Sequence, residues 1–180
     1  VYNALQAQDF FFFFQPVLRA YVSLGSNCES AAAMLEAARA ALAALPDMRM
    51  GAASPVYRTE PQEYADQPWF HNQVVELLPG ESWQPCSLVD ALLDIEARLG
   101  RVRSADPALR YGPRVIDADL LVFGQLRSTD PHCIVPHPRL TGRAFALRPL
   151  LDVAPQLVVE GLPVSQWLER LDCLVEGARI

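Results

Sequence analysis

A strand-like run that contains two carboxylates constrains this chain more than any other part of it. From Val115 to Phe123 the residues are mostly branched or aromatic, with Gly-Pro before the run and Gly124 after it, which predicts a β-strand. Asp117 and Asp119 interrupt it. Because successive side chains of a strand point to opposite faces, the two carboxylates should share one face, with Cβ atoms about 6.5 to 7 Å apart. Two like charges at that spacing repel by roughly 2 to 3 kcal/mol at an effective dielectric near 20, so a positive group should lie between them.

Two kinds of positive partner fit these aspartates. Mg²⁺ prefers carboxylate oxygens from one or two side chains together with the phosphates of a substrate. Arg110 and Arg114, just upstream, suit such phosphates because a guanidinium forms planar, forked hydrogen bonds. The alternative is a pair of surface aspartates on an edge strand, salt-bridged to the same arginines. Asp-x-Asp alone favours that alternative, and the adjacent Gly-Pro-Arg favours the phosphate site.

The arginines form a local basic cluster in an acidic chain. The formal net charge is -6 and the pI is about 5.0, which argues against nucleic-acid binding, because that activity needs a broad basic face. Every basic residue is arginine, and five lie between positions 98 and 114: Arg98, Arg101, Arg103, Arg110 and Arg114. Such a cluster suits a small polyanion such as a nucleoside triphosphate. The alternative is a solvated loop.

Length and composition predict one domain. A chain of 180 residues, 51% hydrophobic, can bury one core and is short for two. Residues 1–18, with five consecutive phenylalanines at 10–14, are expected to be an N-terminal extension of unknown role, and residues 19–180 the single domain. No apolar run approaches eighteen residues, so no membrane span is expected.

The cysteines predict neither a zinc site nor a disulfide framework. They are far apart and show no Cys-x-x-Cys spacing. Their positions are Cys28, Cys86, Cys133 and Cys173. A reducing cytoplasm is therefore the expected setting.

The predicted elements alternate in an order that indicates the fold class. Strands are expected over Arg19–Leu24, Met48–Tyr57 and Phe70–Leu78, and in the aspartate run. Helices are expected over Ser30–Leu45, Ser87–Leu99, Arg143–Leu151 and Pro163–Leu174. Strand, helix, strand, strand, helix, strand is the split βαβ order of ferredoxin-like folds. We therefore expect an α+β fold with a ferredoxin-like βαββαβ core, in which a mainly antiparallel sheet carries helices on both faces, a three-layer αβα arrangement.

Seven motifs resemble one enzyme family. Gly-Pro-Arg-x-x-Asp-x-Asp-Leu-Leu is similar to the signature of the 6-hydroxymethyl-7,8-dihydropterin pyrophosphokinase family. Six further stretches match it in the same order: Ser23-Leu-Gly-Ser-Asn27, Tyr57-Arg-Thr-Glu-Pro61, Phe70-His-Asn72, Gly100-Arg-Val-Arg103, Val135-Pro-His-Pro138 and Arg143-Ala-Phe145. The resemblance covers residues 20 to 160 and implies transfer of pyrophosphate from ATP to the pterin alcohol, with AMP and the pterin pyrophosphate as products, in folate biosynthesis.

The resemblance also implies roles for the matching residues. Asp117 and Asp119 would be ligands of two Mg²⁺ ions about 4 Å apart. The catalytic set would be Arg101, Arg103, Arg114, Asp117 and Asp119. ATP contacts would come from Glu96, Arg103, Arg110, Arg114, Leu120, His137 and Arg143. The pterin would be held by Thr59, Pro61, Phe70, Asn72, Tyr111 and Phe145, with the two phenylalanines stacking on it and the amide at its edge.

For four of these residues, a purely structural role is the alternative. Glu96 fits a surface glutamate equally well, His137 between two prolines fits a packed turn, and Phe70 and Phe145 fit core packing. The chain also departs from the family pattern at Ser104, His132 and Pro138 and in a longer loop over 104–111.

Two other functions compete with the pyrophosphokinase. A non-catalytic ferredoxin-like binding module would need neither aspartate. A nucleotidyltransferase would also use a Gly-Ser turn and Asp-x-Asp, but it keeps the two close in sequence, whereas Ser26 and Asp117 are far apart. Fusion to, or action beside, another folate enzyme is a further possibility.

Overall fold

The computed structural model describes residues 17–61, 66–102, 114–171, 174–175 and 178–179. Almost all of the predicted N-terminal extension lies outside these ranges, so the division at residue 18 stays a prediction. The helices are α1 (Ala31–Ala43), α2 (Pro85–Arg98), α3 (Ala144–Val153) and α4 (Val164–Leu168), with a 3-10 turn, η3 (Leu140–Gly142). The strands are β1 (Ala20–Ser26), β2 (Met48–Ala53), β3 (Tyr57–Thr59), β4 (Phe70–Pro79), β5 (Asp117–Phe123), β6 (Val158–Val159), β7 (Leu162–Pro163), β8 (Leu174–Val175) and β9 (Ala178–Arg179).

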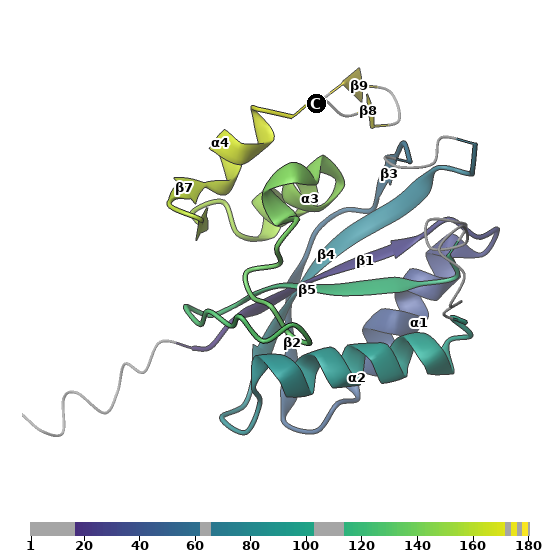
Figure 1. The fold of residues 1–180 in the computed structure, drawn as a ribbon. Helices are drawn as coiled ribbons and strands as arrows, with labels where there is room; N and C mark the ends of the chain where they lie inside the picture. Colours follow the sequence, from purple (N-terminus) through teal and green to yellow (C-terminus); the bar gives the residue numbers. More distant parts are fainter. Residues whose placement is uncertain (1–16, 62–65, 103–113, 172–173, 176–177, 180) are drawn as a thin grey trace, which may run out of the picture.

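One antiparallel sheet forms the middle layer of the fold (Figure 1). Its strands lie in the order β5-β1-β4-β3-β8-β9, and β2 pairs with the half of β4 that β3 leaves free. β1 therefore lies between β4 and β5, which are its neighbours on either side. This is the order expected for a ferredoxin-like core, and the predicted fold class is confirmed.

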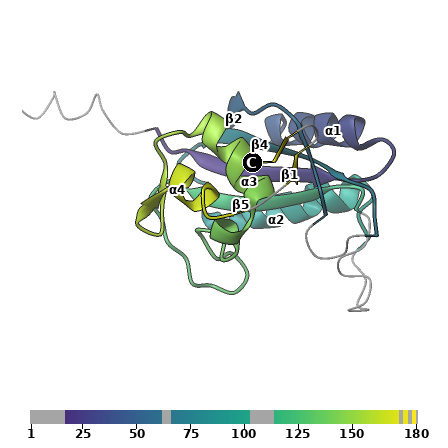
Figure 2. The ribbon, with the colours of Figure 1, turned by 90° about the horizontal axis from the view of Figure 1, so that it is seen from above.

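The two faces of the sheet carry different helices. α1 and α2 cover one face, where Leu35, Leu92 and Ile95 pack against Val22 and Leu24 of β1. α3 and α4 lie over the other face, as the view from above shows (Figure 2). The alternation of β1 divides its side chains between these two faces, so every second residue is turned away from the α1 and α2 core.

Several element boundaries differ from the prediction. The single strand expected over 48–57 is two strands, because Pro55 has no N–H to donate and Ser54 instead bonds to Val74 through both its backbone N–H and its hydroxyl. The helix expected over 163–174 is shorter: α4 has 5 residues, and Leu174 and Val175 form β8 beside β3. α2 begins where Pro85 occupies the first turn and Gln84 and Ser87 form a capping box.

The prediction that no cysteines pair is wrong for one pair. Cys86 and Cys133 form a disulfide across a sequence separation of 47 residues. Spacing along the chain could not indicate it, because the fold brings the first turn of α2 against the segment that follows β5. Within the described ranges, no helix is long and apolar enough to cross a bilayer.

Candidate active site

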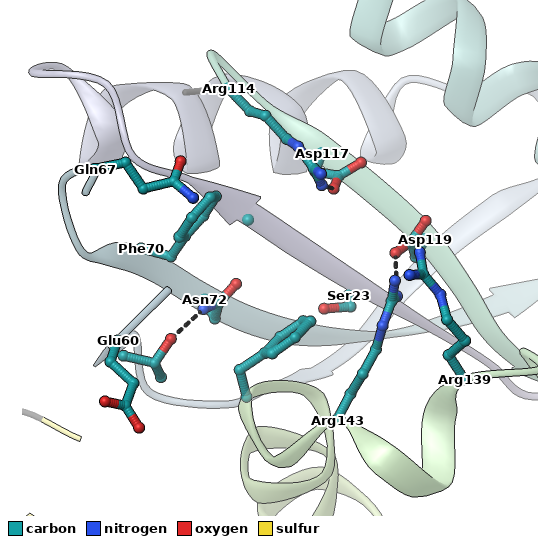
Figure 3. Close-up of a pocket in the computed structure, with 13 residues that line it drawn as sticks. Ser23, Glu60, Gln67, Phe70, Asn72, Arg114, Asp117, Asp119, Arg139 and Arg143 are labelled. Carbon is teal, nitrogen blue, oxygen red and sulfur yellow. Dashed lines mark hydrogen bonds and ion pairs between the residues drawn. The ribbon is translucent and has the colours of Figure 1, made fainter. Parts of the chain in front are cut away.

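A polar pocket opens on the α3 side of the sheet (Figure 3). Its empty space, with the open mouth included, is about 680 Å³. Its lining is Ser23, Gly25, Thr59, Glu60, Gln67, Phe70, Asn72, Arg114, Asp117, Asp119, Arg139, Arg143 and Phe145. Predicted phosphate, metal and pterin residues thus meet in one cavity.

The floor of the pocket is β1, and its small residues create the space. Gly25 pairs with Asp117 of β5 on one side and with Asn72 of β4 on the other. Ser23 pairs with Asp119 in the same way. A Cβ atom at Gly25 would lie only 2.8 Å from the Asn72 Oδ1 atom. The carboxylates and the amide therefore face one cavity from opposite sides of a strand that offers almost no side-chain volume.

Asp117 is held by two arginines. Its two carboxylate oxygens accept hydrogen bonds from Arg101 and Arg114, and 18% of its side chain is exposed. Burial raises the pKa of the Asp117 carboxyl, but the charges and hydrogen bonds of the two arginines outweigh burial, and the pKa lies below its usual range. Asp117 is thus ionised at neutral pH, and the predicted positive partners of the aspartates are present.

Asp119 belongs to a second cluster of the pocket, which it forms with Arg143 and His137. The Arg143 guanidinium lies 2.8 Å from Asp119 Oδ2 and 3.4 Å from His137 Nε2. The backbone N–H of His137 donates to Leu121 O at 2.8 Å, which fixes the histidine beside β5. Burial, opposed by the Asp119 charge and helped by those of Arg143 and Arg139, lowers the His137 pKa. The imidazole is therefore neutral at neutral pH.

Glu96 lies behind Asp117 and is not a surface residue. Its side chain is 1% exposed, accepts a hydrogen bond from the Ala118 backbone N–H at 2.8 Å and forms an ion pair with Arg101. Arg101 in turn reaches Asp117. The surface interpretation of Glu96 is wrong, and its contacts support Arg101 from inside the fold.

The part of the pocket near Asn72 and Phe70 has the features of a site for a flat polar ring. Asn72, 3% exposed, donates from Nδ2 to Thr59 Oγ1 at 2.8 Å. A dashed line from Asn72 marks this bond in Figure 3. The hydroxyl thus fixes the orientation of the amide. Phe70 and Phe145 both line the cavity, and the Arg143 guanidinium lies 5.5 Å from the ring centre of Phe145. Two aromatic faces and an oriented amide suit stacking with hydrogen bonds at the ring edge.

Some predicted site residues lie elsewhere. Leu120 is 4% exposed in the core under α1 and α2, on the face of β5 opposite to Asp119, so its side chain is not in the pocket. Pro61 is described but is not among the lining residues. Three predicted residues, Arg103, Arg110 and Tyr111, and the loop over 104–111 fall outside the described residues.

Other residues at the site were missed by sequence reasoning. Ser23, Gly25, Glu60, Gln67 and Arg139 also line the pocket. The alternation of Ser23 and Gly25 with large residues in β1 was a usable signal, because it predicts a face without side-chain bulk.

Asn27 connects the two loops at the pocket's edge. It is 4% exposed, and its Oδ1 atom accepts from the Arg114 backbone N–H at 2.7 Å. Its Nδ2 atom donates to Gln67 Oε1 at 3.0 Å and to Pro68 O at 3.1 Å. The Asn27 amide thus bonds both to the loop before Phe70 and to the backbone of Arg114.

Comparisons with known proteins agree with this geometry. The family model described as 7,8-dihydro-6-hydroxymethylpterin-pyrophosphokinase (HPPK) matches residues 21–155. The 2-amino-4-hydroxy-6-hydroxymethyldihydropteridine pyrophosphokinase of Methylorubrum extorquens is 44% identical over 154 residues, which are 86% of this chain and 94% of that protein. The Pseudomonas aeruginosa protein of the same name is 43% identical over 163 residues, covering 89% and 95% of the two chains.

A solved structure supports the fold alone. The wild-type Plasmodium falciparum HPPK-DHPS with pteroate superposes with a TM-score of 0.64 at 12% identity, over 85% of this chain and 44% of that chain. This chain therefore spans less than half of that protein, whereas it spans nearly all of the two bacterial relatives. On the family match and the identity to these relatives, the chain belongs to the 7,8-dihydro-6-hydroxymethylpterin-pyrophosphokinase (HPPK) family.

Proposed function

We propose that this chain transfers pyrophosphate from ATP to 6-hydroxymethyl-7,8-dihydropterin and releases AMP and the pterin pyrophosphate, a step of folate biosynthesis. One observation carries the proposal most directly. Asp117 and Asn72 of this chain both pair with Gly25, one on each side of β1. The Asp117 carboxylate, with the arginines that bind it, and the oriented Asn72 amide therefore face the same cavity. A phosphate donor and a pterin bound there would lie side by side.

The donor set fits Mg²⁺. Asp117 and Asp119 offer hard carboxylate oxygens on one strand face, and both line the pocket. When bound, two Mg²⁺ ions would neutralise phosphate charge and stabilise the oxygens of an in-line displacement. The aspartates are the residues that would hold them.

The protein's own groups act by positioning and by charge. Arg114 and Arg143 already lie at the pocket, paired with carboxylates from which they can turn to phosphate oxygens. Asn72, fixed by Thr59, would bind the pterin edge, and Phe70 and Phe145 would stack on its faces. Holding two reactants in attack geometry supplies much of the rate in phosphoryl-type transfer, which needs little covalent chemistry from the protein.

The test is AMP formation from Mg²⁺-ATP with and without 6-hydroxymethyl-7,8-dihydropterin. AMP should appear only with the pterin and fall by two or more orders of magnitude in Asp117→Ala and Asp119→Ala, the size expected when groups that stabilise transition-state charge are lost. Asp94→Ala is the matched control, because Asp94 is an exposed aspartate of α2 whose partner is Arg98. Its AMP formation should equal that of the wild type.

The product separates this function from its competitors. Pyrophosphate in place of AMP would indicate a nucleotidyltransferase. Binding of the pterin by a folded protein that forms no AMP would favour the binding module. We also propose that this domain acts beside a second folate enzyme, as the joined name HPPK-DHPS suggests for the Plasmodium protein.

A further inference from the structure

The Cys86–Cys133 pair lies outside the pocket and has no part in the proposed reaction. It joins the first turn of α2 to the segment over 128–135 that precedes His137. α2 also carries Glu96, which supports Arg101. The disulfide thus connects the helix behind Asp117 with the segment that leads to the second cluster of the pocket.

The two sulfur atoms have different surroundings. Cys86 is the second residue of the 14-residue helix α2 and is partly exposed. The N-terminus of a helix favours a thiolate, and exposure gives access to small reagents. Cys133 is 2% exposed, and its sulfur lies 3.6 Å from the Ser128 hydroxyl. One accessible cysteine with a buried partner is the arrangement in which the first attacks a reagent and the second resolves the intermediate.

The segment around Cys133 has contacts that do not depend on the disulfide. Ser128 and Val135 exchange backbone hydrogen bonds of 2.9 and 3.2 Å, and the Cys133 N–H donates to Asp130 O at 2.9 Å. His132 Nε2 lies 2.7 Å from Asp90 Oδ1 of α2. The backbone bonds order the segment and the His132–Asp90 contact holds it against α2, so both thiols should stay adjacent after reduction and the bond can form again.

We propose that Cys86 and Cys133 form a reversible thiol–disulfide site, oxidised by low-molecular-weight disulfides and reduced by dithiols while the protein stays folded. In oxidation, the Cys86 thiolate attacks one sulfur of the reagent, forms a mixed disulfide and releases one thiol. Cys133 then loses its proton and attacks the Cys86 sulfur, which releases the second thiol. The protein thiols give up two electrons and two protons, and the two released reagent thiols carry them.

A metal is the rival occupant of the same atoms. The sulfurs of Cys86 and Cys133 and a carboxylate oxygen of Asp130 lie within 4.8 Å of one another. Two thiolates and a carboxylate are ligands that Zn²⁺ accepts. A reduced protein that binds one Zn²⁺ per chain through these residues, and resists oxidation, would overturn the redox proposal.

Peptide mapping tests the bond directly. Because the chain has no lysine, trypsin cuts only after arginine, and Cys86 and Cys133 are the only cysteines of the peptides 59–98 and 128–139. After treatment of the folded protein with glutathione disulfide, these peptides should be recovered joined, at a mass lower by two hydrogens than their sum. Dithiothreitol added before denaturation should separate them. Absence of the joined peptide after oxidation, or its resistance to dithiothreitol until the protein is denatured, would overturn the proposal.

Thermal unfolding supplies the second measurement. Oxidation should raise the melting temperature by roughly 5 to 15 °C over the reduced protein, because the cross-link closes a long loop. Cys86→Ser should lose this redox-dependent shift, and its partly exposed position allows the variant to fold. Cys28→Ser, which changes a free cysteine outside the pair, should keep it. An equal shift in Cys86→Ser would overturn the assignment.

Discussion

Asp117 and Asn72 lie on opposite sides of one glycine, because Gly25 of β1 pairs in register with both. The proposed phosphate end and the proposed pterin end of the pocket are therefore separated by the width of a single strand. The distance between two bound substrates would be set by the two strand spacings from β5 across β1 to β4, about 4.8 Å each, and this spacing is among the most constant dimensions in proteins.

Gly25→Ala should damage pterin binding selectively. The new Cβ atom would lie 2.8 Å from Asn72 Oδ1, and Asn72 is tied to Thr59, so the amide must move from its orientation. We expect kcat/KM for the pterin to fall about 10-fold or more, since small displacements of reacting groups are costly. Gly142→Ala is the control, because a Cβ there meets no atom within 4 Å. Equal kinetics of Gly25→Ala and the wild type would contradict a pterin edge at Asn72.

Asn27 should act as a positioning residue. Asn27→Ala removes the acceptor of the Arg114 N–H and the donor to Gln67 and Pro68, and we expect kcat/KM to fall about 10- to 100-fold, the equivalent of one to two buried hydrogen bonds. Asn27→Asp keeps the acceptor and loses the donor. Steady-state kinetics of the two variants should therefore separate the loops, with the ATP parameters of Asn27→Asp closer to the wild type. Identical losses in both variants would show that the Arg114 contact is unimportant.

Glu96 should stabilise the fold and the site together. Glu96→Gln keeps an oxygen for the Ala118 N–H but removes the charge that pairs with Arg101. We expect the free energy of unfolding to fall by about 1 to 3 kcal/mol, with a lower kcat. Asp94→Asn, on the same helix, breaks only an exposed pair with Arg98 and should change the free energy of unfolding by less than about 0.5 kcal/mol. Urea titrations of both variants measure the difference, and a neutral Glu96→Gln would contradict the support of Arg101.

The acid sensitivity of the fold should depend on Glu76. Burial raises the pKa of this carboxyl, but the Ala52 N–H and the Arg19 guanidinium outweigh burial, and the pKa lies below its ordinary value of 4.5. Since the folded state then binds fewer protons than the unfolded chain, the stabilisation is complete above pH 4.5 and is lost as the pH falls through the lower, folded-state pKa.

The measurement is urea unfolding of the wild type and Glu76→Gln across a pH series. Their difference in free energy of unfolding should be constant near neutral pH and shrink as the pH falls below 4.5. Glu36→Gln, a surface change on α1, is the control variant in the same series. A Glu76 difference that persists unchanged at pH about 3 would mean that the charge of Glu76 contributes nothing.

The aspartates show what a local pattern can predict. The period of two in a strand puts Asp117 and Asp119 on one face without any knowledge of the rest of the chain, and the structure confirms it. The same rule turns Leu120 to the opposite face, so its predicted ATP contact, which came from resemblance, is not supported by side-chain geometry. A contact of Leu120 with ATP through its backbone stays a prediction.

Other features depended on contacts that no local pattern contains. The burial of Glu96 follows from where α2 packs on β5, and the bond between Cys86 and Cys133 joins elements 47 residues apart. Asn27 lay in a motif that carried only the family resemblance and no role for this residue, whereas its side chain bonds to residues far along the chain. Tertiary packing decides all three, so each could be found only once the sheet order was known.

The alternation of side chains in β1 makes the stability of the fold and the opening of the pocket depend on the same strand register. Val22 and Leu24 enter the core, while Ser23 and Gly25 form the floor of the cavity. A slip of one residue against β4 and β5 would exchange the two sets, fill the cavity with hydrocarbon and leave glycine and serine in the core. A misregistered chain is then unstable and unable to admit a ligand for the same reason, so molecules that persist as folded protein are already those with an open site.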